Sequence, residues 1–183
     1  GAAVQERARA GRLAAMLERC GATGRPWLLL GQHRMDQAET VLFRALRGSG
    51  AAGLAGMAPC RAAGPALILR PLLGLHRQVT VQACEDQGIT PWIDPHNSDP
   101  AYTRVRVRDT VLPLLEKELG PGISEALART ATTLREDSET LDALALEWAH
   151  EIVNTDDDGR ISLDVGGIVA QPPALRQRIC RIV

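Results

Sequence analysis

Side chains able to move a proton gather in one short stretch of the sequence, Gly31–Thr40 (GQHRMDQAET). His33 and Asp36 stand three residues apart there, and an imidazole beside a carboxylate can orient or deprotonate a nucleophile. A structural interpretation uses the same residues, because Asp36 can cap a helix while His33 occupies a loop. The pattern by itself favours the structural interpretation.

A second candidate group follows closely, in the sequence Arg47-Gly48-Ser49-Gly50. Glycines let backbone N–H groups approach an anion closely, and the guanidinium supplies positive charge, so the group could hold a phosphate. Glycines also simply end helices, and Arg44 and Arg47 could form the solvated face of one.

A third group, Arg104, Arg106 and Arg108, alternates with valines. In an extended segment the three guanidinium groups share one side, about 7 Å apart from one to the next. In a helix only Arg104 and Arg108 share a face. The group could bind a polyphosphate or an RNA backbone, or it could pair with Asp94 and Asp99 in the preceding turn.

A strand, a helix and the polar turn between them, which we call the elbow, are expected to position His33 and Asp36. The apolar run 27–31 predicts a buried strand, and helical spacing of apolar residues predicts a helix after it. Asp36-x-x-Glu39 has the form of a capping box, so the helix is predicted to begin at Asp36 and to end at Arg47. In α/β proteins ligands bind at the carboxyl ends of strands, where helix N-termini begin, so this elbow is the candidate site.

The remaining elements are mostly helical. Helices are expected at 1–20, 76–87, 107–119, 123–153 and from about 172, short strands at 66–69 and 160–165, and a loop at 48–64. The last helix is predicted to carry Leu175 and Ile179 inward, with its arginines in solvent. The longest helix shows one apolar stripe, made of Leu127, Ala131, Leu134, Leu141, Leu144, Trp148 and Ile152. Helix–strand–helix order indicates an α/β fold with a parallel sheet, followed after about residue 120 by a mostly helical part.

The composition limits the classes of protein to which this chain can belong. The chain has 183 residues, a net charge of −1 and 45% apolar residues, so it can form a core and has no overall basic signature for nucleic acid. Its four cysteines are far apart and form no CxxC pair, so we expect no metal site and no disulfide framework, which favours the reducing cytoplasm. No apolar run reaches membrane-spanning length, so no membrane partner is expected.

Three blocks of sequence, in this order and spacing, together resemble tRNA(Ile)-lysidine synthetase. They are Gly31–Met57 (GQHRMDQAETVLFRALRGSGAAGLAGM), Leu69–Leu75 (LRPLLGL) and Pro91–Leu115 (PWIDPHNSDPAYTRVRVRDTVLPLL). The resemblance implies part of an N-type ATP pyrophosphatase (PP-loop) domain with a Rossmann-like parallel sheet over residues 1–120. A mostly helical linker or tRNA-binding domain would then occupy residues 121–183.

The reaction implied by the resemblance is an ATP-dependent C–N ligation. ATP, with Mg²⁺, adenylates the wobble cytidine of an isoleucine tRNA with a CAU anticodon at its C2 oxygen, and pyrophosphate leaves. The ε-amine of free L-lysine then attacks C2, AMP leaves, and lysidine is formed. Whether the protein forms a homodimer is left open.

The resemblance also implies roles for particular residues. His33, Asp36 and Arg106 would lie at the reacting centre. The nucleotide side would be formed by Gln32, Arg47, Gly48, Ser49 and Gly50. The tRNA or its phosphates would be bound by Arg70, Arg104 and Arg108.

The sequence departs from the family pattern at several places. The SGGxDS phosphate loop is absent from the 183 residues and would lie upstream of Gly1, so we expect a part of a longer enzyme that adenylates nothing by itself. Met35 stands where an acidic or amide residue is usual, Val105 where Asn is usual, and Asp109 where His is common. Two rival functions stay open: a related ATP pyrophosphatase such as a tRNA thiolase, for which Cys60 is the only nearby cysteine, and a non-catalytic helical module that binds RNA or protein.

Overall fold

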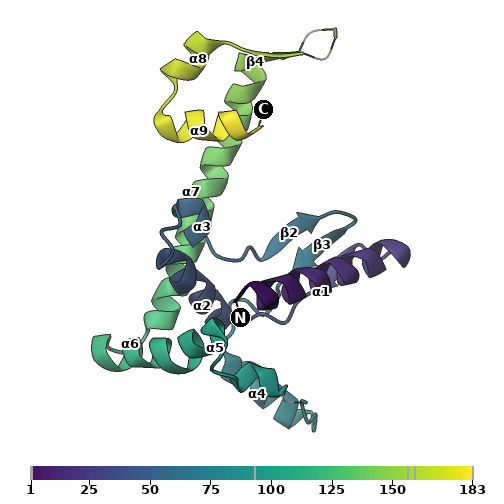
Figure 1. The fold of residues 1–183 in the computed structure, drawn as a ribbon, viewed down its shortest axis with the longest axis vertical. Helices are drawn as coiled ribbons and strands as arrows, with labels where there is room; N and C mark the ends of the chain where they lie inside the picture. Colours follow the sequence, from purple (N-terminus) through teal and green to yellow (C-terminus); the bar gives the residue numbers. More distant parts are fainter. Residues whose placement is uncertain (1, 93, 156, 159, 183) are drawn as a thin grey trace. The chain divides into compact units, whose positions relative to one another are not determined.

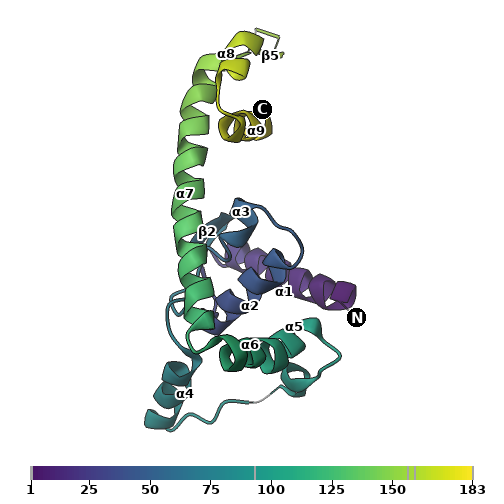
Figure 2. The ribbon, with the colours of Figure 1, turned by 90° about the vertical axis from the view of Figure 1, so that its left-hand side faces the viewer.

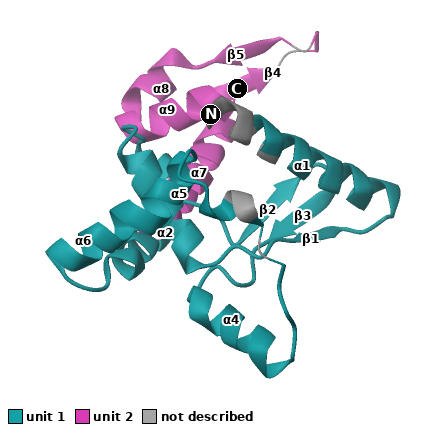
Figure 3. Cartoon of the chain, turned by 60° about the horizontal axis from the view of Figure 1, so that its bottom comes forward, with its two compact units in different colours: residues 1–132 teal, residues 133–183 magenta. Residues whose placement is uncertain are grey.

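The computed structural model describes residues 2–92, 94–155, 157–158 and 160–182. The chain forms two compact units, residues 1–132 and 133–183, which Figure 3 shows in different colours. The long helix α7 (Ile123–Ile152) begins in the first unit and ends in the second. The expected mixed α/β class, with a largely helical later part, is confirmed. The predicted division into domains near residue 120 stays a prediction.

A three-stranded sheet organises the first unit, in the order β1 (Trp27–Leu29), β3 (Ala66–Leu69), β2 (Cys60–Ala63). β1 and β3 pair in parallel, as the helix–strand–helix order predicts. β2 pairs antiparallel to β3 and lies in a segment predicted to be a loop, which also contains the short helix α3 (Ala51–Leu54). A two-residue turn joins β2 to β3, and Gly64 supplies its positive φ of 54°.

Helix α1 (Ala2–Ala22) packs against β1 and β3 and runs alongside the sheet in Figure 1. Ala66 and Ile68 of β3 are buried and share one face by strand alternation. Trp27 and Leu29 of β1 are more than half exposed, so the prediction of a buried strand is wrong for β1. The apolar run identified the strand correctly, but these two side chains lie on an open face of the sheet.

Helix α2 (Arg34–Ala45) lies in the interior of the first unit, between α3 and the helices α5 and α6 in Figure 2. Its central residues Gln37–Val41 are all buried. Ala38 packs with Val107 and Leu112, and three half-buried side chains surround that cluster: Met35, Leu42 and Leu127. The helix that carries the candidate site is therefore enclosed along its middle turn.

The segment predicted to be helical from about residue 107 begins earlier. It consists of α5 (Thr103–Arg106), a π-helical turn η2 (Val107–Val111) and α6 (Leu112–Leu119). Pro113 has no N–H to give to the carbonyl of Asp109, and its ring would crowd that carbonyl in a regular α-helix. A wider π turn at this place removes that conflict.

Between β3 and α5 the chain forms α4 (Arg77–Asp86), within one residue of the predicted ends, and a 3₁₀ turn η1 (Pro95–Ser98) in the segment expected to be irregular. Gly88, with a φ of 66°, follows α4 and has the left-handed conformation typical of a helix end.

The second unit contains the last part of α7, a hairpin of β4 (Val153–Thr155) and β5 (Ile161–Leu163), then α8 (Val165–Ala170) and α9 (Pro173–Ile182). Its core consists of Ala145, Ala149, Ile152, Leu175 and Ile179. The inward placement of Leu175 and Ile179 on α9 is confirmed.

The apolar stripe predicted for α7 is partly wrong. Leu144 and Trp148 are more than a third exposed, whereas the neighbouring Ala145 and Ala149 are buried. Small residues at the contact let the packed helices approach closely, an arrangement that hydrophobic spacing alone does not predict. Arg178, expected in solvent, instead pairs with Asp142 at 2.7 Å.

No helix among the described residues is both long enough and apolar enough to cross a lipid bilayer.

Candidate functional site

The elbow between β1 and α2 is built around His33 and Asp36. His33 is the N-cap of α2, which begins at Arg34, two residues earlier than predicted. The Asp36 carboxylate accepts a hydrogen bond from the backbone N–H of His33 at 2.9 Å. The capping relationship therefore joins His33 to Asp36, and the predicted box of Asp36 with Glu39 is wrong.

The imidazole of His33 lies against the same carboxylate, with Nδ1 3.3 Å from Asp36 Oδ2. Burial lowers the pKa of His33 below its usual value, and the charge of Asp36 offsets this only in part. The positive charges of Arg77, His76 and Arg108 lower the pKa further. His33 is therefore mainly neutral near pH 7, the form in which an imidazole can accept a proton.

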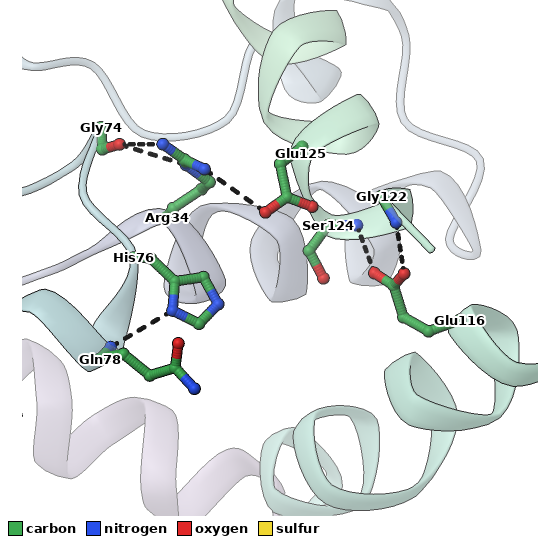
Figure 4. Close-up of polar contacts among 8 residues, drawn as sticks. All are labelled: Arg34, Gly74, His76, Gln78, Glu116, Gly122, Ser124 and Glu125. Atoms are coloured by element: carbon green, nitrogen blue, oxygen red, sulfur yellow. Dashed lines mark hydrogen bonds and ion pairs between the residues drawn. The ribbon is translucent and has the colours of Figure 1, made fainter. Parts of the chain in front are cut away.

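A second helix N-terminus lies at the same edge of the sheet. β1 and β3 are parallel neighbours, and the helices α2 and α4 follow their carboxyl ends. His76 is the N-cap of α4, and its Nδ1 accepts a hydrogen bond from the backbone N–H of Gln78 at 3.3 Å (Figure 4). Two helix N-termini at one sheet edge favour an anion, and the sequence interpretation did not single out His76 or Arg77.

Arg34 holds the elbow to the surrounding elements. Its guanidinium donates to the carbonyl of Gly74 through Nε at 3.1 Å and Nη2 at 2.6 Å, and Nη1 lies 3.4 Å from Glu125 on α7 (Figure 4). One side chain thus connects α2 with the loop after β3 and with the first turn of α7.

Glu116 fixes the junction between α6 and α7. Its carboxylate accepts hydrogen bonds from the backbone N–H groups of Gly122 at 2.6 Å and Ser124 at 2.9 Å (Figure 4). These bonds hold the pKa of Glu116 below its ordinary value. The N-terminus of α7 is therefore capped by a carboxylate from the preceding helix.

Gln32 and Arg70, predicted on different sides of the site, lie together. Arg70 Nε donates to Gln32 Oε1 at 2.6 Å, and its Nη1 donates to the carbonyl of Ala58 at 2.7 Å. Arg70 follows β3 directly and Gln32 lies three residues after the end of β1, so the parallel pairing of those strands brings the two residues to one edge. Their roles toward nucleotide and tRNA stay predictions.

The group Arg47–Gly50 ends α2 and leads into α3. Arg47 stacks over the ring of Phe43, with Cζ 4.0 Å from the ring centre. Gly48 has a φ of 70°, and Gly50 is the N-cap of α3. Binding of a nucleotide by Arg47, Gly48, Ser49 and Gly50 stays a prediction.

Side chains of α2 hold the following loop in place. Arg44 Nη1 donates to the carbonyls of Gly53 at 2.8 Å and Gly56 at 3.0 Å, so Arg44 is a structural support rather than part of a solvated face. The buried amide of Gln37 makes two hydrogen bonds with the backbone of Met57, one as donor at 3.1 Å and one as acceptor at 2.8 Å.

The three alternating arginines lie on a helical segment, so the extended alternative is wrong. Arg106 donates to the carbonyl of Pro100 at 2.7 Å and to the hydroxyl of Thr103 at 3.1 Å. Arg108 donates to the carbonyl of Asn97 and, at 2.8 Å, to the carboxylate of Asp109. The predicted catalytic role of Arg106 and the predicted phosphate contacts of Arg104 and Arg108 stay predictions.

Arg108 nevertheless affects the ionisation of His33 in the elbow. Its charge lowers the pKa of His33, and the charge of Asp36 in turn helps to raise the pKa of Arg108. Residues some seventy positions apart in the sequence are therefore close enough for their charges to interact.

Glu39 is a further ionisable group near the elbow, and the sequence interpretation gave it only a capping role. Its side chain is buried, and burial together with the charge of Asp36 raises its pKa to about 7. Arg108 and Arg104 act in the opposite direction. A glutamate one turn into a helix that begins at a strand end is the signal that could have identified it.

Met35, at the position where the family pattern has an acidic or amide residue, packs against the apolar cluster of Ala38, Val107 and Leu112. This position therefore supplies packing rather than a second carboxylate. Among the described residues, no group of three or more His, Cys, Asp or Glu side chains could hold a metal ion.

The chain is similar in sequence to known proteins over most of its length. The chain is 56% identical to the tRNA(Ile)-lysidine synthase of Leifsonia xyli subsp. xyli over 176 residues, which are 96% of this chain and 52% of that protein. It is 47% identical to the tRNA(Ile)-lysidine synthase of Thermobifida fusca over 174 residues, which are 95% of this chain and 51% of that protein.

A further relative, the tRNA(Ile)-lysidine synthase of Mycobacterium tuberculosis, is 45% identical over 159 residues, which are 84% of this chain and 46% of that protein. The chain spans about half the length of the curated relatives it matches. These similarities confirm the resemblance drawn from the three sequence blocks. Residues 1–115 match the family model described as a PP-loop domain, and the chain therefore belongs to the PP-loop domain family.

Proposed function

We propose that this chain takes part in the ATP-dependent formation of lysidine on an isoleucine tRNA. The observation that carries the proposal is 56% identity, across 96% of the chain, to a protein named tRNA(Ile)-lysidine synthase. In the proposed reaction ATP adenylates the wobble cytidine at its C2 oxygen. The ε-amine of L-lysine then attacks C2 and AMP leaves.

The elbow supplies groups suited to the charges of this reaction. The α-phosphate gains negative charge during adenylation, and fixed positive groups stabilise that charge. The N-termini of α2 and α4 and the guanidinium of Arg108 are such groups. His33, mainly neutral at pH 7, and Asp36 are proposed to lie beside the reacting atoms.

ATP is proposed as a substrate that brings Mg²⁺ on its phosphates. Because the described residues offer no cluster of three metal-binding side chains, we assign no residue to the ion. The 183 residues contain no SGGxDS phosphate loop, so we propose that they do not turn over ATP by themselves.

The proposal is tested with the purified protein that carries this chain, radiolabelled L-lysine and an isoleucine tRNA transcript with a CAU anticodon. We expect label to enter the tRNA only when ATP is present, with release of pyrophosphate and AMP. A matched transcript with uridine at the wobble position should accept no label. Absence of lysine incorporation into the cytidine transcript would contradict the proposed function.

A further inference from the structure

The loop that leads into α4 is fastened to the start of α2. The backbone N–H of Arg34 donates a hydrogen bond to the carbonyl of Leu75 at 2.9 Å, and the Arg34 guanidinium donates to the preceding carbonyl, that of Gly74 (Figure 4). Arg34 directly follows the N-cap of α2, and Leu75 directly precedes the N-cap of α4. These bonds bring the two N-cap residues, His33 and His76, close together, so the first turn of α4 belongs to the candidate site.

The imidazole of His76 uses one ring nitrogen for its own helix and leaves the other available. Its Nδ1 accepts a hydrogen bond from the backbone N–H of Gln78, so the neutral ring carries its proton on Nε2 (Figure 4). His76 is only partly buried, so a ligand can reach this N–H group. The bond that caps α4 therefore also orders a neutral hydrogen-bond donor beside the elbow.

Arg77, the first residue of α4, is exposed, and its guanidinium makes no hydrogen bond or ion pair within the part of the chain that the structure describes. Its charge nevertheless reaches the elbow, because it lowers the pKa of His33 on α2 and that of Asp109 on η2. The guanidinium of Arg108, by contrast, is already bonded to Asp109. The fold thus holds the Arg77 cation near the elbow with its donors free for a ligand.

Positive groups gather on this side of the elbow. Arg77, His76 and Arg108 all lower the pKa of His33, and among the charges that act on His33 only that of Asp36 raises it. Like charges held together repel one another and attract an anion. A guanidinium can donate two parallel hydrogen bonds to a phosphate, and an imidazole N–H can add a third. A phosphate group is therefore the ligand that best fits these side chains.

We infer that Arg77 and His76 bind a phosphate group of a substrate at the first turn of α4, an inference that rests on the proposed function. The Arg77 guanidinium donates two hydrogen bonds to the phosphate oxygens, and the Nε2–H of His76 donates one. No covalent bond forms or breaks there, so the two residues contribute to binding rather than to the chemical steps. Two substrates of the proposed reaction carry phosphate, ATP and the tRNA, and each gives a different experimental result.

The first experiment measures the KM for ATP and the KM for the tRNA transcript during lysine incorporation by the protein that carries this chain. We expect Arg77→Gln to raise one of these KM values about tenfold and to leave kcat within about twofold, because it removes one charge-assisted contact. Arg77→Lys keeps the charge but not the planar fork, and should raise the same KM less. Arg61→Gln, which removes an exposed arginine of β2, should change neither KM. Two unchanged KM values in Arg77→Gln would overturn the inference.

Two variants of His76 separate its donor from its capping role. His76→Ser keeps an oxygen that caps α4 but removes the Nε2 donor, so the urea midpoint should stay unchanged while the same KM rises about fivefold. His76→Asn keeps a cap acceptor and has an amide N–H, so it should restore part of the binding. An unchanged KM in His76→Ser would show that the imidazole serves only as a cap, and would overturn the inference.

A third measurement needs no turnover, so it separates failure of this inference from failure of lysine transfer by the wild-type protein. Binding of ATP and of the tRNA transcript is measured between about 50 and 200 mM KCl. For a tRNA phosphate, Arg77→Gln should reduce the slope of log Kd against log [KCl] by about 0.7 and leave ATP binding unchanged. For an ATP phosphate, it should weaken ATP binding about tenfold and leave the tRNA slope unchanged. Loss of neither, or equal loss of both, would overturn the inference.

Discussion

The carboxylate of Asp36 accepts a hydrogen bond from the backbone N–H of His33 at 2.9 Å while its Oδ2 lies 3.3 Å from the imidazole Nδ1 of the same residue. One carboxylate therefore both caps helix α2 and faces the imidazole. The structural and chemical interpretations of this pair, which the sequence presents as alternatives, are compatible in the folded chain.

Substitution of Asp36 separates these two contributions. Asp36→Ala removes the cap acceptor and should lower the free energy of unfolding by about 1 kcal/mol. Asp36→Asn keeps an oxygen acceptor and should lower it by less. If Asp36 also pairs with the substrate ammonium, both variants should lose lysine transfer to a similar extent. Urea unfolding measures the first effect and labelled-lysine incorporation the second, and full transfer activity in Asp36→Asn would contradict the chemical role.

Glu39 should make stability depend on pH. Its pKa in the folded chain is about 7, against an ordinary value of 4.5, so folding favours the protonated form. The associated stability is fully present below pH 4.5 and is lost as the pH rises through 7, by an amount on the order of 3 kcal/mol. Glu39→Gln should remove this component. Urea unfolding of both proteins between pH 4.5 and 8 tests this, and parallel pH dependences would contradict it.

Local sequence patterns predicted the helices and strands more accurately than they predicted how these elements pack together. α4 and α9 lie close to their predicted ranges because spacing, caps and flanking prolines act over a few residues. β2 was missed because Cys60–Ala63 lacks a β-branched or aromatic residue and is held as a strand by its pairing with β3. The start of α2 was misplaced because Glu39 fits a capping pattern, whereas the capping box of the folded chain joins His33 with Asp36 and the Glu39 side chain is buried.

The candidate site, too, could be predicted from local sequence only in part. The polar elbow was identified from the strand and helix around it, but the nearness of Arg108 depends on the packing of η2 against α2. The pairing of Gln32 with Arg70 depends on parallel strand pairing, which no local pattern fixes in register. His76 was missed because its place beside the elbow follows from the tertiary fold.

Arg34 should contribute to the stability of the first unit mainly through its bonds to Gly74. Arg34→Met keeps much of the apolar stem but removes two hydrogen bonds to a backbone carbonyl, and we expect a loss of about 1–2 kcal/mol. Glu125→Gln, which removes only the partly exposed ion pair at 3.4 Å, should cost less than about 1 kcal/mol. Equal losses in the two variants, measured by urea unfolding, would show that the ion pair dominates instead.

Gly56 should be the least replaceable glycine of the loop after α2. Its φ is 65°, and a Cβ added there would lie 2.7 Å from Oε1 of Gln37, the side chain that bonds the backbone of Met57. Gly56→Ala therefore combines backbone strain with loss of a buried hydrogen-bonded contact, and should cost about 3 kcal/mol. Gly24→Ala is the matched control, because Gly24 has a φ of 64° with nothing within 4 Å, and should cost only about 1 kcal/mol. Urea unfolding of both variants measures the difference. Equal costs would mean that the Gln37 side chain moves away from the added methyl group with no loss of stability.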